Sequence, residues 1–154
     1  MNIKDLSNVK LNADENFSAG LYCAESVLLT IADAYDIETE LFPKIATAFC
    51  SGMSRTCGTC GALTGGILGI SSVHGRTGAA ESVEKVYKAT QELIAGFESE
   101  FGSKNCHQLL GCDLGTPEGQ ETFRKEGLNS RCHAYTIKAA ELAVEIIEKY
   151  NKVE

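Results

Sequence analysis

The sequence predicts an all-α protein, organised as a single domain over residues 1–154 in the form of a bundle of five or six helices. Apolar residues recur at the three-to-four-residue spacing of a helix face in several segments. β-Branched residues, by contrast, never alternate with polar ones over a strand-length run. With 44% hydrophobic residues, the 154-residue chain is also long enough to enclose a continuous core.

The first predicted helix covers residues 14–35 and follows a loosely structured lead-in over residues 1–11. Its inner face carries small or apolar residues at i, i+3, i+4, i+7, i+8 and i+11. These residues are Gly20, Cys23, Ala24, Val27, Leu28 and Ile31. Cys23 is therefore expected on the buried side of this helix.

A second helix is expected to begin at Thr39, whose hydroxyl can cap free backbone N–H groups, with Pro43 in the first turn. Residues 50–56 then predict a loop. The third helix covers residues 61–73 and carries a glycine at every fourth position. These glycines are Gly61, Gly65 and Gly69. Such a smooth line fits close packing against another helix, or the approach of a bulky ligand.

The remaining helices are predicted from their start and stop signals. Gly102 is a typical helix stop, and Ser103 can cap the short segment that follows it. Thr116 precedes a proline and an acidic residue, which is the pattern of a helix start. Besides this short segment, helices are expected over residues 79–101, 116–127 and 130–150.

Four of the seven cysteines are expected to meet in one buried site. They are Cys23, Cys60, Cys106 and Cys132. Three of them fall on inward helix faces, and Cys60 opens the glycine-rich helix. Their separations along the chain are too long for one local metal knuckle, but they suit one ligand per helix inside a bundle.

Cys60 is expected to be the most reactive of these thiols. Free N–H groups and the positive end of the dipole at a helix start favour the thiolate, which attacks disulfides and binds metals. Cys57 forms a CxxC pair with Cys60 and is either a resolving thiol, an extra ligand or a plain loop residue. No strand precedes the pair, which argues against a thioredoxin-like fold. Cys50 and Cys112 are weaker candidates.

The cysteine segments, taken together, resemble the redox-active protein family with the C_GCAxxG_C_C pattern. The matching segments are residues 22–28, 60–66 and 101–111, with Cys132 in the place of the last cysteine. The resemblance implies an all-helical, cysteine-dependent redox protein, although Cys57 stands where the family more often has glycine. More distantly, the chain resembles the non-haem part of split-Soret cytochromes, whose relatives bind iron–sulfur clusters and haem. Covalent haem is not expected, because the chain has no CxxCH motif.

Three functions follow as hypotheses. In the first, the four cysteines at 23, 60, 106 and 132 bind an iron–sulfur cluster, or zinc, for electron transfer. In the second, Cys60 attacks a disulfide and Cys57 or another core cysteine resolves it, as in a dithiol–disulfide oxidoreductase. In the third, the protein is a non-enzymatic interaction module with buried cysteines.

Charge and composition limit the classes of binding partner and the cellular locations that are expected. A net charge of −7 argues against nucleic-acid binding, because no basic stripe offsets it. The sequence shows no signal peptide and no apolar run long enough to span a membrane, so a cytoplasmic location is expected. In a reducing compartment, seven cysteines are more typical of metal ligands or redox thiols than of structural disulfides. The expected partner is an unidentified redox protein, and a homo-oligomer stays open.

Overall fold

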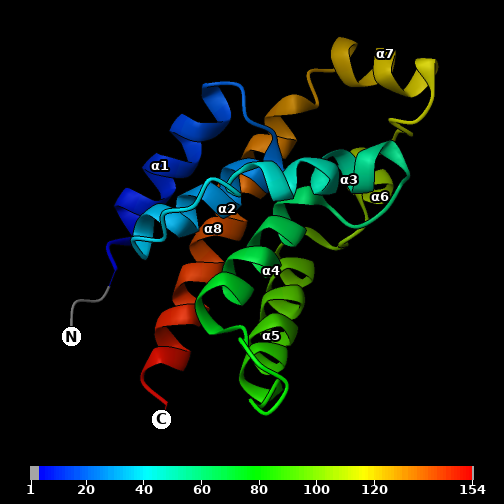
Figure 1. The fold of residues 1–154 in the computed structure, drawn as a ribbon. Coiled ribbons are helices and arrows are strands. Elements are labelled where there is room, and N and C mark those ends of the chain that lie inside the picture. Colours follow the sequence, from blue (N-terminus) through cyan, green and yellow to red (C-terminus); the bar gives the residue numbers. More distant parts are fainter. Residues whose placement is uncertain (1–3, 154) are drawn as a thin grey trace.

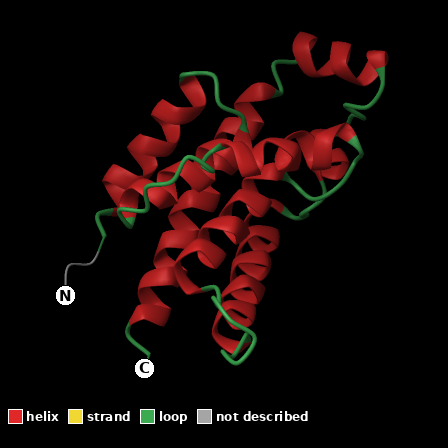
Figure 2. Ribbon diagram, in the orientation of Figure 1, coloured by secondary structure: helices red, strands yellow, loops and turns green. Residues whose placement is uncertain are grey.

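Eight α-helices and one 3₁₀-helix make up the computed structural model, which describes residues 4–153. Figure 2 shows these helices joined by loops, and no strand occurs in the described range. The prediction of an all-α protein is therefore confirmed, whereas five or six helices was too few. The difference arises in the N-terminal half, where one predicted helix is two and a predicted loop contains a helical turn.

The bundle is built around α2 (Cys23–Ala34), α4 (Gly61–His74) and α8 (Asn129–Asn151), which all pack against one another. α5 (Glu84–Phe101) packs on α4 and α8, and α1 (Leu6–Ser18) packs on α2 and α8. Figure 1 shows α4, α5 and α8 running side by side, with the shorter helices gathered at one end of them. That end holds the site described below.

The single helix predicted over residues 14–35 is wrong, because the chain forms α1 and α2 with a turn between them. Gly20 has a φ of +109°, a backbone conformation that only glycine adopts easily, and it ends the first helix. The second helix restarts where the Tyr22 N–H donates to Glu25 Oε1 at 3.1 Å. Cys23 consequently lies at the start of a helix rather than in the middle of one.

The predicted start at Thr39 is also wrong. Proline lacks an N–H and disfavours a helical residue before it, and helical structure begins only after Pro43, as the 3₁₀-helix η1 (Lys44–Phe49). The peptide bond between Phe42 and Pro43 is cis. The helical turn α3 (Cys50–Arg55) follows directly in place of the predicted loop.

The glycine line of α4 packs against α2, which agrees with the helix-packing interpretation. A Cβ built on Gly65 would lie 2.6 Å from the Ala24 carbonyl oxygen, and one on Gly69 would collide with Ile31. The two helix axes can approach so closely only because these positions lack side chains. Gly61, the first glycine of the line, contacts the Cys23 sulfur instead.

The C-terminal helices largely follow their predicted signals. Gly102 ends α5 with a φ of +83°, and Thr116 caps α7 (Pro117–Lys125) by accepting from the Gly119 N–H at 3.0 Å. α5 begins later than predicted, at Glu84, whose N–H is capped by a serine hydroxyl. α6 (Cys106–Leu110) is capped by Asn105 rather than by the predicted serine. None of the helices in residues 4–153 combines the length and the apolar composition needed to cross a bilayer.

Candidate functional site

A cavity of about 230 Å³ lies at the end of the bundle where the short helices gather. All four cysteines that the sequence singled out contribute to its wall. They are Cys23, Cys60, Cys106 and Cys132. The fold therefore brings four distant thiols to one cavity, and their chemical role stays a prediction.

Each of these cysteines lies at or near the N-terminal end of a helix. Cys60 is the N-cap residue of α4, while Cys23 and Cys106 are the first residues of α2 and α6. Cys132 lies in the first turn of α8. Because the N-terminal end of a helix carries partial positive charge, the four helix ends around the cavity favour bound negative charge.

Backbone hydrogen bonds hold Cys60 and Cys106 at a fixed separation. The Cys60 N–H donates to the Lys104 carbonyl at 2.8 Å, and the Cys106 N–H donates to the Gly58 carbonyl at 2.9 Å. The side-chain amide of Asn105 donates to the Cys57 carbonyl at 2.7 Å. The two loops that carry these cysteines are thus fastened to each other directly.

A left-handed backbone turn forms another part of the wall. Residues 51–55 all have φ between +57° and +67°, although only Gly52 among them is a glycine. The Gly52 carbonyl accepts hydrogen bonds from Thr56 and Gly58. A Cβ built on Gly52 would lie 2.6 Å from the Cys106 Cβ. Left-handed residues are costly and persist mainly where surrounding structure enforces them, often at functional sites.

Cys23 and Cys50 form a contact that the sequence did not reveal. A Cβ built on Gly61 would collide with the Cys23 sulfur and lie 3.1 Å from the Cys50 Cα. The Cys50 thiol lies within hydrogen-bonding reach of Cys23, and this contact, together with burial, raises the Cys50 pKa. The sequence makes Cys50 only a weaker candidate, because residues 50–56 predict a loop and not a buried helix face.

Burial governs the protonation of the cavity thiols. It raises the pKa of Cys60 to about 12, of Cys132 to about 12 and of Cys106 to about 11. At Cys60 the backbone N–H groups of Ala62 and Leu63 act in the opposite direction, but burial outweighs them. The expectation that the helix start makes Cys60 a thiolate is therefore wrong for the unliganded protein. A bound cation would reverse this balance, because a metal ion deprotonates a thiol that coordinates it.

Five apolar and seven polar side chains complete the cavity wall. The apolar residues are Phe17, Leu109, Leu110, Leu114 and Phe123. The polar residues are Tyr22, Ser51, Arg55, Gln120, Arg124, Asn129 and Tyr135. Helix α7 supplies three of these residues and so covers one side of the cavity.

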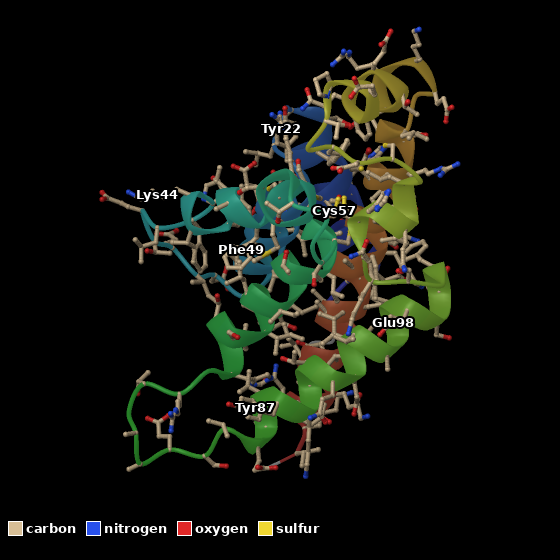
Figure 3. The ribbon with its side chains drawn as sticks, turned by 90° about the vertical axis from the view of Figure 1, so that its right-hand side faces the viewer. Tyr22, Lys44, Phe49, Cys57, Tyr87 and Glu98 are labelled. Atoms are coloured by element: carbon tan, nitrogen blue, oxygen red, sulfur yellow. The ribbon has the colours of Figure 1, made fainter. Side chains whose placement is uncertain are left out.

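Cys57 and Cys112 do not line the cavity. Cys57 is half-buried, and Figure 3 shows it on the face where α3 and α6 lie side by side. Hydrogen bonding to the Asp113 side chain raises its pKa. Both thiols lie near Cys106 and raise its pKa by their charge. The structure thus separates the two cysteines of the CxxC pair, with only Cys60 on the cavity.

Within residues 4–153, no three or more His, Cys, Asp and Glu side chains are arranged to hold a single metal ion. All seven cysteines are free thiols in this arrangement. The donor set around the cavity consists of four sulfurs, and soft thiolate donors suit iron–sulfur clusters, zinc and copper(I). The donor types present therefore fit a sulfur-ligated group.

One comparison with known proteins identifies a relationship. The family described as "Putative redox-active protein (C_GCAxxG_C_C)" matches residues 21–146, a range that includes all four cavity cysteines. Comparison with curated proteins and with solved structures finds no match. Since the match extends over most of the chain, the protein belongs to this family of redox-active proteins.

Proposed function

We propose that the four cavity cysteines hold an iron–sulfur cluster and that the protein carries single electrons. The observation that supports this proposal most strongly is the convergence of thiols from four helices on one cavity of about 230 Å³. Iron–sulfur clusters are bound by cysteine thiolates, commonly four of them. The proposed ligands are Cys23, Cys60, Cys106 and Cys132.

The surroundings suit such a group in two respects. The positive ends of four helices offset the negative charge that four thiolates bring into a buried site. The apolar side chains of the wall, together with hydrogen bonding and charge, would tune the potential of a cluster. When bound, the cluster would supply one-electron redox chemistry, while the chain supplies ligands, charge and exclusion of water.

The test is reconstitution of the reduced protein with iron and sulfide in the absence of oxygen. We expect a brown protein that contains iron and acid-labile sulfide and shows a reducible visible absorption band. Serine at any one of the four positions should abolish or strongly reduce iron content. Cys57→Ser is the matched control, because that thiol lies outside the cavity lining, and it should retain iron. A colourless protein without iron after reconstitution would refute the proposal.

Zinc is the alternative that the same samples resolve. Tetrahedral zinc requires four sulfurs at about 2.3 Å from one ion. The same four cysteines would supply those sulfurs. If the protein is colourless and binds one zinc per chain through all four cysteines, the bound group is zinc and the cluster proposal is refuted.

Dithiol chemistry at Cys60 has less support. Its CxxC neighbour Cys57, the first candidate for the resolving thiol, lies outside the cavity lining. As part of the proposal, the partner is an unidentified redox protein in a reducing, cytoplasmic compartment, where free thiols persist.

A further inference from the structure

Cys50 is one of two buried cysteines that the proposed cluster does not use, the other being Cys112. Cys50 does not line the cavity, whereas Cys23, whose sulfur it approaches, does. Both residues lie against Gly61, the position where any side chain would collide with the Cys23 sulfur. The fold therefore holds one cavity thiol and one concealed thiol in contact.

The Cys50 side chain is held in this position from more than one direction. Its sulfur lies 3.7 Å from the Ala46 carbonyl oxygen and 3.8 Å from Glu25 Oε1. The Glu25 carboxylate is itself fixed by hydrogen bonds from the Tyr22 N–H and the Thr47 hydroxyl. The Cys50 sulfur is thus held between two hydrogen-bond acceptors, within reach of Cys23.

We propose that Cys23 and Cys50 form an oxidisable pair, in which hydrogen peroxide oxidises Cys23 from the cavity and Cys50 closes a disulfide behind it. Cys23 is the site of attack because it faces the cavity, and peroxide is small enough to enter a space of about 230 Å³. Cys50 is the resolving thiol because it contacts Cys23 and lies outside the cavity lining.

The chemistry balances in two steps. The Cys23 sulfur attacks one oxygen of hydrogen peroxide as the O–O bond breaks, and the departing hydroxide takes up the proton that the Cys23 thiol loses, so the products are a sulfenic acid and water. The Cys50 sulfur then attacks the Cys23 sulfur, the S–O bond breaks, and the departing hydroxide leaves as water with the proton of the Cys50 thiol. In sum, two thiols are oxidised to one disulfide, and one peroxide is reduced to two waters.

The consequence for the cavity rests on the proposed function. A Cys23 sulfur bonded to Cys50 cannot also bind iron, so the disulfide removes one of the four proposed ligands. Cys50 itself is not a ligand, and its replacement should leave cluster assembly in the reduced protein intact. Oxidation of this pair would therefore act as a reversible block on cluster assembly.

The first experiment needs no variant. The reduced, metal-free protein is treated with a small excess of hydrogen peroxide, the remaining thiols are alkylated, and disulfide-linked peptides are mapped by mass spectrometry. We expect the 23–50 linkage as the main product. A main product that joins other cysteines, or the absence of any disulfide within the chain, would overturn the inference.

A variant then tests the resolving role. In Cys50→Ser, peroxide should leave Cys23 as a sulfenic acid that a dione probe traps, and prolonged treatment should give the irreversible sulfinic acid. Wild type should recover at least tenfold more free Cys23 thiol than Cys50→Ser after subsequent reduction with dithiothreitol. Cys112→Ser, which also loses one cysteine outside the cavity lining, should behave as wild type. Equal recovery of Cys23 in wild type and Cys50→Ser would overturn the inference.

Iron uptake distinguishes this inference from the proposed function. If the 23–50 disulfide forms but the reduced protein binds no iron under reconstitution, the pair stands and the cluster proposal fails. If the reduced protein binds iron but no 23–50 disulfide forms, the cluster proposal stands and the pair is refuted.

Discussion

Gly61 shows how one missing side chain can shape the site. A methyl group at this position would collide with the Cys23 sulfur and press on the Cys50 backbone. The glycine that follows Cys60 in the sequence is therefore required by a cysteine almost forty residues earlier in the chain. This contact explains in physical terms why a glycine follows Cys60 at the start of α4.

We expect Gly61→Ala to lower the free energy of unfolding by about 1–3 kcal/mol, the usual cost of overpacking a core. Displacement of the Cys23 sulfur should also reduce iron uptake. Urea denaturation and iron analysis check both effects. Gly78→Ala is the control, because a Cβ there has no atom within 4 Å, and it should change neither quantity. Unchanged stability in Gly61→Ala would contradict the packing described here.

The buried thiols also predict a pH dependence of the unliganded protein. Unfolded thiols ionise near their ordinary pKa of 9.0, whereas burial holds Cys60 and Cys132 protonated up to about 12. The folded state binds more protons in this interval, so the free energy of unfolding should fall as pH rises from about 9 to 12 and stay level below it.

Denaturation at a series of pH values, compared with a variant in which Cys60 and Cys132 are serine, measures this effect. The fall should be smaller in the variant, since the other ionisable groups are common to both proteins. Thiolate absorbance in the ultraviolet reports the same titration directly. A thiolate signal from the folded protein at pH 8 would show that the helix ends outweigh burial after all.

Residue-level sequence reasoning succeeded where periodicity carried the information. Cys106 was placed on an inward face by its spacing to two leucines, and Cys132 was placed near a helix start. The protonation of Cys60 was predicted in the wrong direction, because a sequence pattern indicates a helix start but not how deeply the residue before it is buried.

At the scale of elements, the left-handed turn of α3 is the least expected feature. Four of its five positive-φ residues carry side chains, and each such residue costs roughly 1–2 kcal/mol if the conformation is uncompensated. No sequence rule predicts a series of this kind, since the usual signal for positive φ is glycine or asparagine. The loop predicted over residues 50–56 therefore had the right composition but the wrong geometry.

Two substitutions in this turn should have opposite effects. Gly52→Ala adds a methyl group against Cys106 at a positive φ, and we expect a loss of about 1–3 kcal/mol and reduced iron uptake. Met53→Gly removes a side chain from an exposed left-handed position, and we expect a gain of up to about 1 kcal/mol. Chemical denaturation of the pair checks the signs, and destabilisation by Met53→Gly would argue against a left-handed turn.

Helix α7 is a cover for the cavity more than a part of the bundle. It contributes Gln120, Phe123 and Arg124 to the cavity wall. Gly119 fixes its N-terminal turn, because any Cβ there would collide with the Asp113 carbonyl. The helix is therefore fastened at one end and presents an aromatic ring to the thiols.

We expect Phe123→Ala to leave iron uptake intact without oxygen and to shorten the lifetime of the reconstituted site in air several-fold. The reason is that removal of the ring opens the apolar wall to water and oxygen. Loss of visible absorbance over time measures the lifetime. Tyr87→Ala is the control, because Figure 3 shows this exposed ring on α5, far from Cys57. Equal lifetimes would mean that α7 does not shield the site.

For the whole molecule, the four proposed ligands join helices that are otherwise held mainly by packing. The buried core side chains come from α2, α4, α5 and α8 in particular, and include Leu28, Leu63, Phe97 and Ile147. α6 adds Leu109 and Leu110 to this core, whereas the buried residue of α7 is a glycine, Gly119. A group bound to cysteines on four helices would join α6 to α2, α4 and α8.

Loading the protein with iron and sulfide should therefore raise its thermal unfolding temperature, because a ligand that binds only the folded state stabilises that state. Removal of the iron with a chelator should reverse the increase. Circular dichroism under anaerobic conditions measures both transitions. A protein without the four cysteines should show no such shift, and an equal shift in that protein would mean that iron binds elsewhere.

The architecture as a whole was predictable because most of its helices carry their own signals. Thr116 capped its helix and Gly102 ended another as expected. The break at Gly20 was missed because the apolar spacing continues across it, and a face pattern alone cannot tell one helix from two with a common face. The approach of Cys50 to Cys23 lay beyond the sequence, since it depends on a backbone conformation and not on a pattern.

The backbone hydrogen bonds between the loops that carry Cys60 and Cys106 have a consequence for inheritance. Each of these residues supplies a sulfur and also the backbone N–H that fixes its distance from the other sulfur. The carbonyls that accept these bonds belong to Lys104 and Gly58. Any amino acid at position 104 offers the same acceptor, but a Cβ at position 58 would lie 2.7 Å from the Met53 Cγ. Descendants of this chain can therefore exchange residue 104 freely, whereas the glycine at position 58 must be inherited together with the two cysteines to preserve their spacing.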